Sequence, residues 1–342
     1  MMKTKVRIKD IAKMANVSTA TVSRVINNKP EGVGIELRNQ ILKYIKDTGY
    51  CPNLLAKSMV TKKTYTIGLL SPDISAPFFQ YLIKGINDYL QAHDYTMILC
   101  NSDFNASGYH KYIETLLGKG IDGIILIGFF GETSQTLMDL LSGTPIVLFD
   151  YVPNLEQVVQ INTNNRQSAY ELTRYLTDMG HERIGCIIGP EQFDTVRERL
   201  KGYQRALREK GIPYDSSIIL RGDFSTDSAM EPAGRLLRQS DVTAIFCFND
   251  LMAYGVYKLC TQLKKRIPDD ISVVGFDDIP YSELLNPPLT TVYQPGYRLG
   301  AEGAKMLLSQ INGTEEKKIK KVLKNSLIIR SSVKNRKAGK YE

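Results

Sequence analysis

From about residue 65 onward, short apolar runs alternate along the chain with helix-length segments whose apolar residues recur every three or four positions. Strands that alternate with helices in this way are typical of parallel sheets covered by helices on both faces. The eight predicted strands and their helices contain too many residues for one compact core. We therefore predict two α/β lobes that divide near the polar stretch Tyr151–Asn165. The predicted strands are Thr66–Leu70, Thr96–Cys100, Gly123–Ile127, Ile146–Phe149, Ile184–Ile188, Ile218–Leu220, Ala244–Phe248 and Ser272–Phe276.

The first 60 residues carry only short helical patterns. Apolar residues at positions 8, 11, 12 and 15 mark one face of a helix, and Asn16 then tolerates the left-handed conformation of a tight turn. Ser18 is suited to cap a second helix over Thr19–Asn27, and Ile35–Thr48 predicts a third. This arrangement is typical of a helix-turn-helix that binds DNA, although an ordinary three-helix bundle has the same spacing.

Charge divides the chain into three blocks. Residues 1–64 hold 13 basic and 4 acidic side chains, residues 65–316 hold 21 and 31, and residues 317–342 hold 10 and one, for a total net charge of +8. A basic head on an acidic body favours a polyanionic partner for the head, and so supports nucleic acid over an ordinary bundle. The basic terminal block matches no motif, and we expect it to be a solvated edge and tail.

Several classes of protein are disfavoured. The first residues lack the apolar run of a secretory signal and no stretch has 18 uninterrupted apolar residues, so we expect a cytoplasmic protein. The five cysteines form no C-x-x-C pair and none of the three histidines lies near a cysteine, so we expect neither a metal nor a cofactor. The chain lacks a phosphate-binding P-loop, a dinucleotide-binding glycine motif and a nucleophile elbow, and we predict that it is not an enzyme.

Specific strings in the N-terminal part carry a family resemblance. They are Asp10-Ile11-Ala12, Val17-Ser18, Thr21-Val22-Ser23-Arg24-Val25, Gly49-Tyr50, Pro52-Asn53 and Ile67-Gly68-Leu69. In this combination the chain closely resembles the lactose-repressor/galactose-repressor (LacI/GalR) family of transcription factors, and the resemblance continues through most of its length. It implies a small all-α helix-turn-helix head and an α/β two-lobed core, similar to periplasmic binding proteins, with parallel sheets and helices on both faces.

The resemblance implies which residues of the second helix read DNA. Thr19, Ala20 and Arg24 match the positions that reach base edges, where an arginine can pair with guanine and methyl groups can contact thymine. Thr21, Ser23 and Asn27 are better placed for phosphate contacts.

A short hinge helix is implied after the head, over Asn53–Val60. Asn53, Lys57 and Met59 are its expected DNA contacts, with Met59 at the position where the family usually inserts a leucine into the minor groove. So short a helix is marginal without DNA, which makes it suitable as a switch.

The chain departs from the family pattern at several positions. Arg7 stands where a capping threonine is usual, and Gly34 and Leu37 replace a serine and a threonine, so we expect weaker helix starts in the head. In the core, Asn164 replaces an aspartate, which puts the family contact of that residue in doubt.

The implied organisation has three parts: a DNA-binding domain at 1–50, a hinge and linker at 51–64, and a ligand-binding and dimerisation core at 65–342. Within the core, one lobe is expected at about 65–161 and 293–323, and the other at about 162–292 and 324–342. Ligands in such folds bind in the cleft at the carboxyl ends of the strands.

The candidate ligand residues combine aromatic, acidic, amide and guanidinium groups. Arg199 lies early in a helix and has no nearby acidic partner in the sequence. Asp250 and Asp278 belong to cleft motifs of the family and are equally suited to cap the helices that follow them instead. The set suits a polyhydroxylated ligand, with rings for stacking and polar groups for hydroxyls. Its members are Phe78, Phe79, Asp150, Arg199, Phe224, Asn249 and Asp277.

We therefore expect a dimeric repressor of a carbohydrate-utilisation operon. Its partners would be a pseudo-palindromic DNA operator and a small effector, a sugar or sugar phosphate. A catabolite-control-type regulator that answers to a phosphoprotein stays an alternative, as does a repressor that responds to a purine or nucleoside. The missing signal and the DNA-reading head argue against a transport-type sugar-binding protein.

Overall fold

The computed structural model describes residues 6–27, 31–51, 63–128, 134–141, 143–150, 155, 158–239, 241–314 and 320–337. The chain forms two compact units that divide after Thr64. The expected hinge contacts Asn53, Lys57 and Met59 lie outside the described residues. Among the described helices, none is long and apolar enough to cross a membrane, and the described side chains form no cluster of His, Cys, Asp and Glu able to hold a metal.

The N-terminal unit is a bundle of three helices around a small apolar core. The buried side chains come from every helix, which fixes the second helix against the other two. They are Ile11, Ala12, Ala15, Val22, Val25 and Ile41. The helices are α1 (Ile8–Met14), α2 (Thr19–Ile26) and α3 (Ile35–Thr48).

Local side chains set the turn between α1 and α2. Asn16 adopts a positive φ of 51°, and the Ser18 hydroxyl accepts a hydrogen bond of 3.1 Å from the backbone N–H of Thr21. At the start of α1 the carboxylate of Asp10 accepts from the backbone N–H of Arg7 at 2.8 Å, which partly makes good the missing capping threonine.

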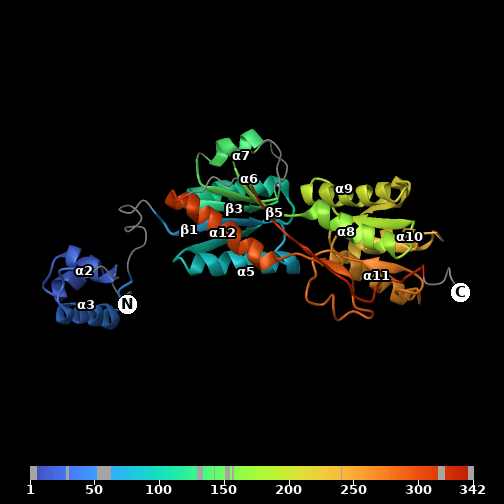
Figure 1. Ribbon diagram of the computed structural model, residues 1–342. Coiled ribbons are helices and arrows are strands. Elements are labelled where there is room, and N and C mark those ends of the chain that lie inside the picture. The colour runs from blue at the N-terminus through green and yellow to red at the C-terminus, as the bar shows by residue number, and fades with distance from the viewer. Residues whose placement is uncertain are drawn as a thin grey trace. The chain divides into compact units, whose positions relative to one another are not determined.

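A six-stranded parallel sheet forms the first lobe of the C-terminal unit, in the order β11-β5-β4-β3-β1-β2. Helices α5 (Pro77–Gln91) and α12 (Gly296–Asn312) cover one face, and α6 (Ala106–Gly118) and α7 (Ser134–Leu141) cover the other (Figure 1). The strands are β1 (Thr66–Ser71), β2 (Thr96–Asn101), β3 (Gly123–Ile127), β4 (Ile146–Phe149), β5 (Val159–Thr163) and β11 (Lys320–Leu323).

Two glycines allow α5 and α12 to pack almost backbone to backbone. A Cβ atom at Gly85 would lie 2.0 Å from the carbonyl oxygen of Tyr297, and one at Gly300 would lie 2.0 Å from that of Leu82. Helix α12 is therefore held tightly against α5, the helix that follows β1.

The second lobe is a four-stranded parallel sheet in the order β7-β6-β8-β9. Helices α8 (Asn165–Asp178) and α9 (Asp194–Glu209) pack together against it, as do α10 (Met230–Leu237) and α11 (Asp250–Gln262) (Figure 1). The strands are β6 (Ile184–Ile188), β7 (Ile219–Arg221), β8 (Ala244–Cys247) and β9 (Ser272–Val274), with short 3₁₀ turns at Ser216–Ile218 and Asp227–Ala229.

All eight predicted strands are present, with ends that differ by at most two residues. Four further strands were not predicted. β5 lies inside the polar stretch that we expected only to divide the lobes, and it alternates apolar and polar residues. β10 (Thr291–Tyr293) and β12 (Ser326–Ile328) form an antiparallel pair, and β11 is a short edge strand beside β5.

The described part of the basic C-terminal block is more than the solvated edge and tail that its charge suggested, although β11 is an edge strand. Its Lys320–Leu323 segment pairs with β5, and Ser332 is fully buried in the second lobe. The Ser332 hydroxyl donates to the carbonyl of Val273 at 2.6 Å and accepts from the backbone N–H of Thr290 at 2.8 Å. The described part of this block therefore belongs to the fold of both lobes.

His181 fastens the same C-terminal segment to the second lobe. Its Nδ1 lies 2.8 Å from the Thr243 hydroxyl, and its Nε2 lies 3.1 Å from the carbonyl oxygen of Lys334. Burial and, to a smaller extent, the charge of Arg336 lower the pKa of His181 to about 4, against the raising effect of the Lys334 hydrogen bond.

This burial predicts a loss of stability in acid. Because unfolded His181 takes up a proton below about pH 6.5 and folded His181 does so only near pH 4, the free energy of unfolding should fall by up to about 3 kcal/mol over that range. His181→Gln should remove this part of the slope in urea denaturation at several pH values, while His93→Gln at the exposed end of α5 should not. An unchanged slope in His181→Gln would contradict the assignment.

Candidate functional site

The head presents one exposed row of side chains on α2. Thr19, Ala20 and Arg24 are exposed, while Val22 and Val25 are buried beneath them. The row contains the three residues expected to read base edges, on a helix held rigidly by its other face.

The residues expected to contact phosphate are also engaged locally. The hydroxyls of Thr21 and Ser18 lie 3.0 Å apart, and the Asn27 amide donates to the carbonyl and hydroxyl oxygens of Ser23 at 2.9 and 3.2 Å. These bonds stiffen both ends of α2.

In the C-terminal unit, a cavity of about 620 Å³ lies where the carboxyl ends of the two parallel sheets face each other. All seven candidate ligand residues line it: Phe78, Phe79, Asp150, Arg199, Phe224, Asn249 and Asp277. The lining residues that were not among the candidates include Phe104, Phe193, Thr195 and Gln294. Their place near the carboxyl ends of strands is the signal that could have identified the first three.

Aromatic rings form much of the cavity wall. The rings of Phe78 and Phe79 lie 5.6 Å apart at the start of α5. Across the cleft, Phe193 contacts Phe104 of the first lobe edge to face at 5.8 Å, and Phe224 of its own lobe at 5.7 Å. The Phe104–Phe193 contact therefore joins the two lobes directly at the cavity.

Arg199 is the cation of the cavity, and it is almost fully buried. Its Nε donates to the Asn165 side-chain oxygen at 2.9 Å, its Nη1 donates to the carbonyl of Phe248, and its guanidinium stacks 3.7 Å from the ring centre of Phe276. Nη2 lies 3.9 Å from a carboxylate oxygen of Asp277, so Arg199 has an acidic partner in the fold although none was expected nearby in the sequence. The partner lies far along the chain, after β9, beyond the reach of local sequence reasoning.

The ionisation of this pair reflects its burial. Burial lowers the pKa of Arg199 to about 10, against the opposing effect of Asp277, Asp150 and Asp250, so the guanidinium stays charged at neutral pH. Burial likewise raises the pKa of Asp277 to about 7, although Arg199 lowers it. Both Asp150 and Asp277 have positive φ angles, of 131° and 123°, a strained conformation typical of functional sites.

The described chain crosses between the lobes three times: at residues 163–165 after β5, at Gln294 after β10 and at Asn325 after β11. A closed ring of polar contacts links the cavity to the first two of these crossings. Asp277 accepts from Gln294 at 2.8 Å, the Thr163 hydroxyl donates to Gln294 at 2.7 Å, and Asn165 donates to that hydroxyl at 3.2 Å. Arg199 closes the ring through its bond to Asn165 and its pairing with Asp277. Thr163 and Asn165 belong to the first crossing and Gln294 to the second.

The third crossing is tied to the same place by Asn164. Its side-chain oxygen accepts from the backbone N–H of Asn325 at 2.7 Å and from the Ser168 hydroxyl at 3.2 Å. The residue that departs from the family pattern thus contacts the third crossing instead of facing the main cavity.

Two of the aspartates have different roles from those expected. It is Asn249 that caps α11, accepting from the backbone N–H of Met252 at 2.9 Å. Asp250 is buried and accepts from the hydroxyls of Ser282 and Thr291, and Asp278 pairs with Arg330 at 2.7 Å. Neither aspartate caps a helix.

The ring makes a prediction about stability. Thr163→Val keeps the shape of the side chain but leaves the buried oxygen of Gln294 without its donor, so the free energy of unfolding should fall by about 1–3 kcal/mol. Thr173→Val is the matched control, since the buried Thr173 hydroxyl bonds only to a carbonyl of its own helix. Urea denaturation measures both, and equal losses would show that Gln294 does not depend on Thr163.

A helix-turn-helix joined to a two-lobed ligand-binding core defines a class of DNA-binding transcriptional regulators. Residues 7–53 match the model of bacterial regulatory proteins of the lacI family, and residues 173–333 match that of a periplasmic binding protein-like domain. The chain belongs to the LacI family, and it is a DNA-binding transcriptional repressor.

Its relatives cover nearly the whole chain. It is 38% identical over 332 residues to the HTH-type transcriptional repressor PurR of Photobacterium profundum, and 36% identical over 329 residues to that of Vibrio vulnificus; each match covers 96% of this chain and 98% of the relative. The lac repressor dimer bound to operator and the anti-inducer ONPF superposes with a TM-score of 0.87 at 25% identity, covering 97% of this chain and all of that one. The complex of the regulator CelR with cellobiose gives a TM-score of 0.72 at 29% identity, covering 96% of this chain and 99% of that one.

Proposed function

We propose that this repressor binds a pseudo-palindromic operator as a homodimer and that a small ligand in the inter-lobe cavity changes its operator affinity. The ligand is a polyhydroxylated ring, a sugar, and the regulated genes form a carbohydrate-utilisation operon. The observation that carries the proposal is the polar ring of Arg199, Asn165, Thr163, Gln294 and Asp277, because it joins cavity groups to two crossings between the lobes.

The ring supplies a mechanism for the response. A ligand hydroxyl that bonds to Asp277 or Arg199 competes with Gln294 or Asn165 for the same atoms, and so changes the bonds that hold the crossings. The lobes then shift between two arrangements, and the ligand favours the one to which it binds more tightly. Hinge residues Asn53, Lys57 and Met59 transmit the shift to DNA in this proposal.

The choice of a sugar is supported by the cavity walls. Rings at Phe78, Phe193 and Phe224 offer apolar faces, while Asp150 and Asn249 offer carboxylate and amide groups beside them. Related structures hold such ligands: one contains cellobiose, and a LacI family regulator from Enterococcus faecium contains ribose.

A purine or nucleoside is the second candidate, because the curated relatives above carry the name PurR. The same rings would stack on a flat heterocycle. The sugar and the purine would occupy the same cavity, so a direct measurement of ligand binding distinguishes these two proposals.

DNA reading by α2 predicts a specific loss. Arg24→Ala should cost about 1–3 kcal/mol of binding free energy at one base pair of each operator half-site, because a bidentate contact to guanine is lost. Arg24→Lys is the matched variant, since it keeps the charge and loses the paired geometry. Binding to operator and to unrelated DNA is measured at one salt concentration, and an equal loss on both would exclude a role in base recognition.

The cavity predicts a separable loss of ligand response. Arg199→Met should abolish the effect of ligand on operator affinity, because the group that contacts the ligand and holds the ring is absent. Arg205→Met, an exposed change on the same helix, should respond normally.

The ligand for this experiment comes from calorimetric titration of the full chain with a panel of free sugars, purine bases and nucleosides. Binding by a purine alone would replace the sugar assignment. A panel without any binding would instead favour a phosphoprotein co-repressor.

A further inference from the structure

Charge around the cavity is strongly one-sided in the sequence. The segments that follow the carboxyl ends of β1 to β4 and of β6 to β9 carry ten Asp and Glu residues and no Lys, Arg or His, in a chain that has 44 Lys plus Arg. These segments are residues 72–76, 102–105, 128–133, 150–158, 189–193, 222–226, 248–249 and 275–290.

The described lining of the cavity has the same imbalance. It contains four carboxylates, Asp73, Asp150, Asp223 and Asp277, against one cation, Arg199. Two of these acids accept from neutral donors, Asp73 from Ser75 and Asp223 from Ser225. Neutral donors leave the negative charge in place.

The single cation of this lining is already neutralised. Arg199 pairs with Asp277 at 3.9 Å and interacts with the charges of Asp150 and Asp250. Its Nε and Nη1 donate to Asn165 and Phe248. A negatively charged ligand would therefore meet a site whose nearby protein charges sum to a negative value.

Helix N-termini do not reverse this balance. A helix start attracts anions through its free N–H groups, but α9 and α11 begin at Asp194 and Asp250, whose carboxylates offset the attraction. At the start of α5, the first residue is Pro77, which has no N–H, and Asp73 lies four residues before it.

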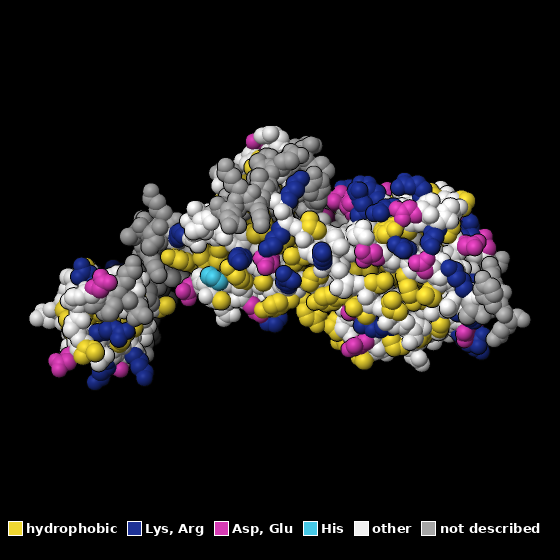
Figure 2. Space-filling view, in the orientation of Figure 1, with side chains coloured by type: hydrophobic (Ala, Val, Ile, Leu, Met, Phe, Trp, Pro, Cys, Tyr) yellow, Lys and Arg dark blue, Asp and Glu magenta, His cyan; other side chains and the backbone are white. Residues whose placement is uncertain are grey.

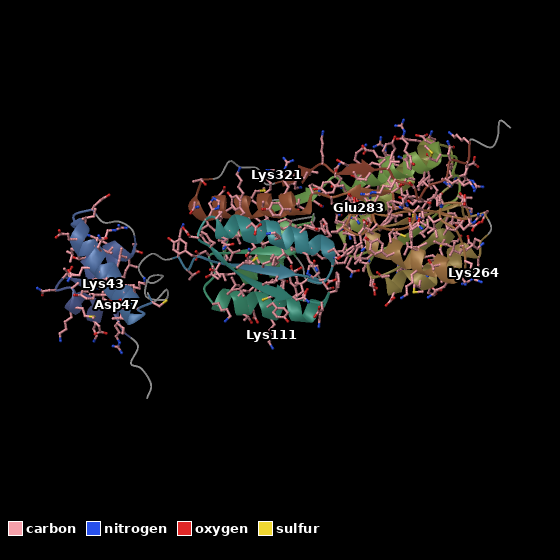
Figure 3. All side chains as sticks on the ribbon, turned by 90° about the horizontal axis from the view of Figure 1, so that it is seen from below. Lys43, Asp47, Lys111, Lys264, Glu283 and Lys321 are labelled. Carbon is pink, nitrogen blue, oxygen red and sulfur yellow. The ribbon has the colours of Figure 1, made fainter. Side chains whose placement is uncertain are left out.

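Basic side chains gather on the outer helices instead. Figure 2 shows Lys and Arg mixed with Asp and Glu over α8 and α9, where Arg166 and Lys201 both pair with Glu198. In Figure 3, Lys111 and Lys264 point outward from their lobes, whereas Glu283 lies on the side of the second lobe that faces the first. Charge is thus separated between the outside of the core and its cleft.

We propose that the cavity selects an effector without negative charge, the unphosphorylated form of a sugar or base, and rejects its phosphorylated form. This inference rests on the proposed function, because it assumes that the cavity binds the effector. A phosphate group brings a charge of about −1.5 to −2 at neutral pH and is normally held by Arg, Lys or free N–H groups. Here it would have to enter beside four carboxylates without a free cation among the described lining residues.

Matched ligand pairs test the proposal by calorimetry on the full chain. The pairs are glucose and glucose 6-phosphate, ribose and ribose 5-phosphate, and adenosine and AMP. In any pair that binds, the phosphorylated member should bind at least about tenfold more weakly, since like charges a few ångströms apart in a partly buried site repel strongly.

The outcomes distinguish the charge preference of the cavity from the existence of an effector site. Tighter binding of a phosphorylated member would overturn this inference and leave the proposed effector site standing. An absence of binding by every member would overturn both, because no small-molecule effector of either charge class would then be found.

A charge substitution gives a second test. Asp73→Lys places a cation in the lining, and the affinity ratio of phosphorylated to unphosphorylated ligand should rise by about tenfold or more. Ser75→Lys does the same from an exposed position if Asp73→Lys fails to fold. Glu231→Lys makes the same charge change as Asp73→Lys, but on the exposed face of α10, and should leave the ratio unchanged. An unchanged ratio in the cavity variants would contradict the proposal.

Discussion

A buried guanidinium organises the ligand-binding core. Burying a charge is costly unless it is paired and hydrogen-bonded, and Arg199 obtains its partners from separate parts of the chain: Asn165 at the start of α8, Phe248 after β8 and Asp277 after β9. These contacts fix α9 against the sheet of the second lobe. Because Asn165 and Asp277 also bond into the crossings, the requirement to satisfy one cation sets the geometry of the connection between the lobes.

The crossings are joined by residues 163–165 and by the pairing of β10 with β12. Thr163 contacts the second crossing through Gln294, and Asn164 contacts the third through the backbone of Asn325. Packing at the two lobes is extensive, whereas this stretch relies on a few polar bonds whose partners a ligand can also engage. In the proposed mechanism a small ligand exchanges these bonds and so shifts the population between two lobe arrangements.

Much of the fold could be predicted because its central strands are continuous apolar runs. β1, β3, β6 and β8 are buried on both faces, so their residues are hydrophobic whatever their neighbours are. The missed strands lack this property. β5 alternates apolar and polar residues, β11 lies at the edge of its sheet, and β10 and β12 are three residues each, so they exist because a partner strand lies beside them.

The sequence by itself determined the head, the alternating core and the residue types that follow the strands, including the seven cavity candidates and the absence of basic residues from the segments after β1 to β4 and β6 to β9. Helix and strand periodicity are local properties, and a parallel sheet brings its carboxyl ends to one edge wherever the strands lie in sequence. Only the tertiary structure decided which side chains meet: Arg199 with Asp277, Phe104 with Phe193, and Asn249 instead of Asp250 as the cap of α11. The first two pairs depend on how the elements pack around the cleft, and the cap depends on backbone angles at one residue, neither of which a local pattern specifies.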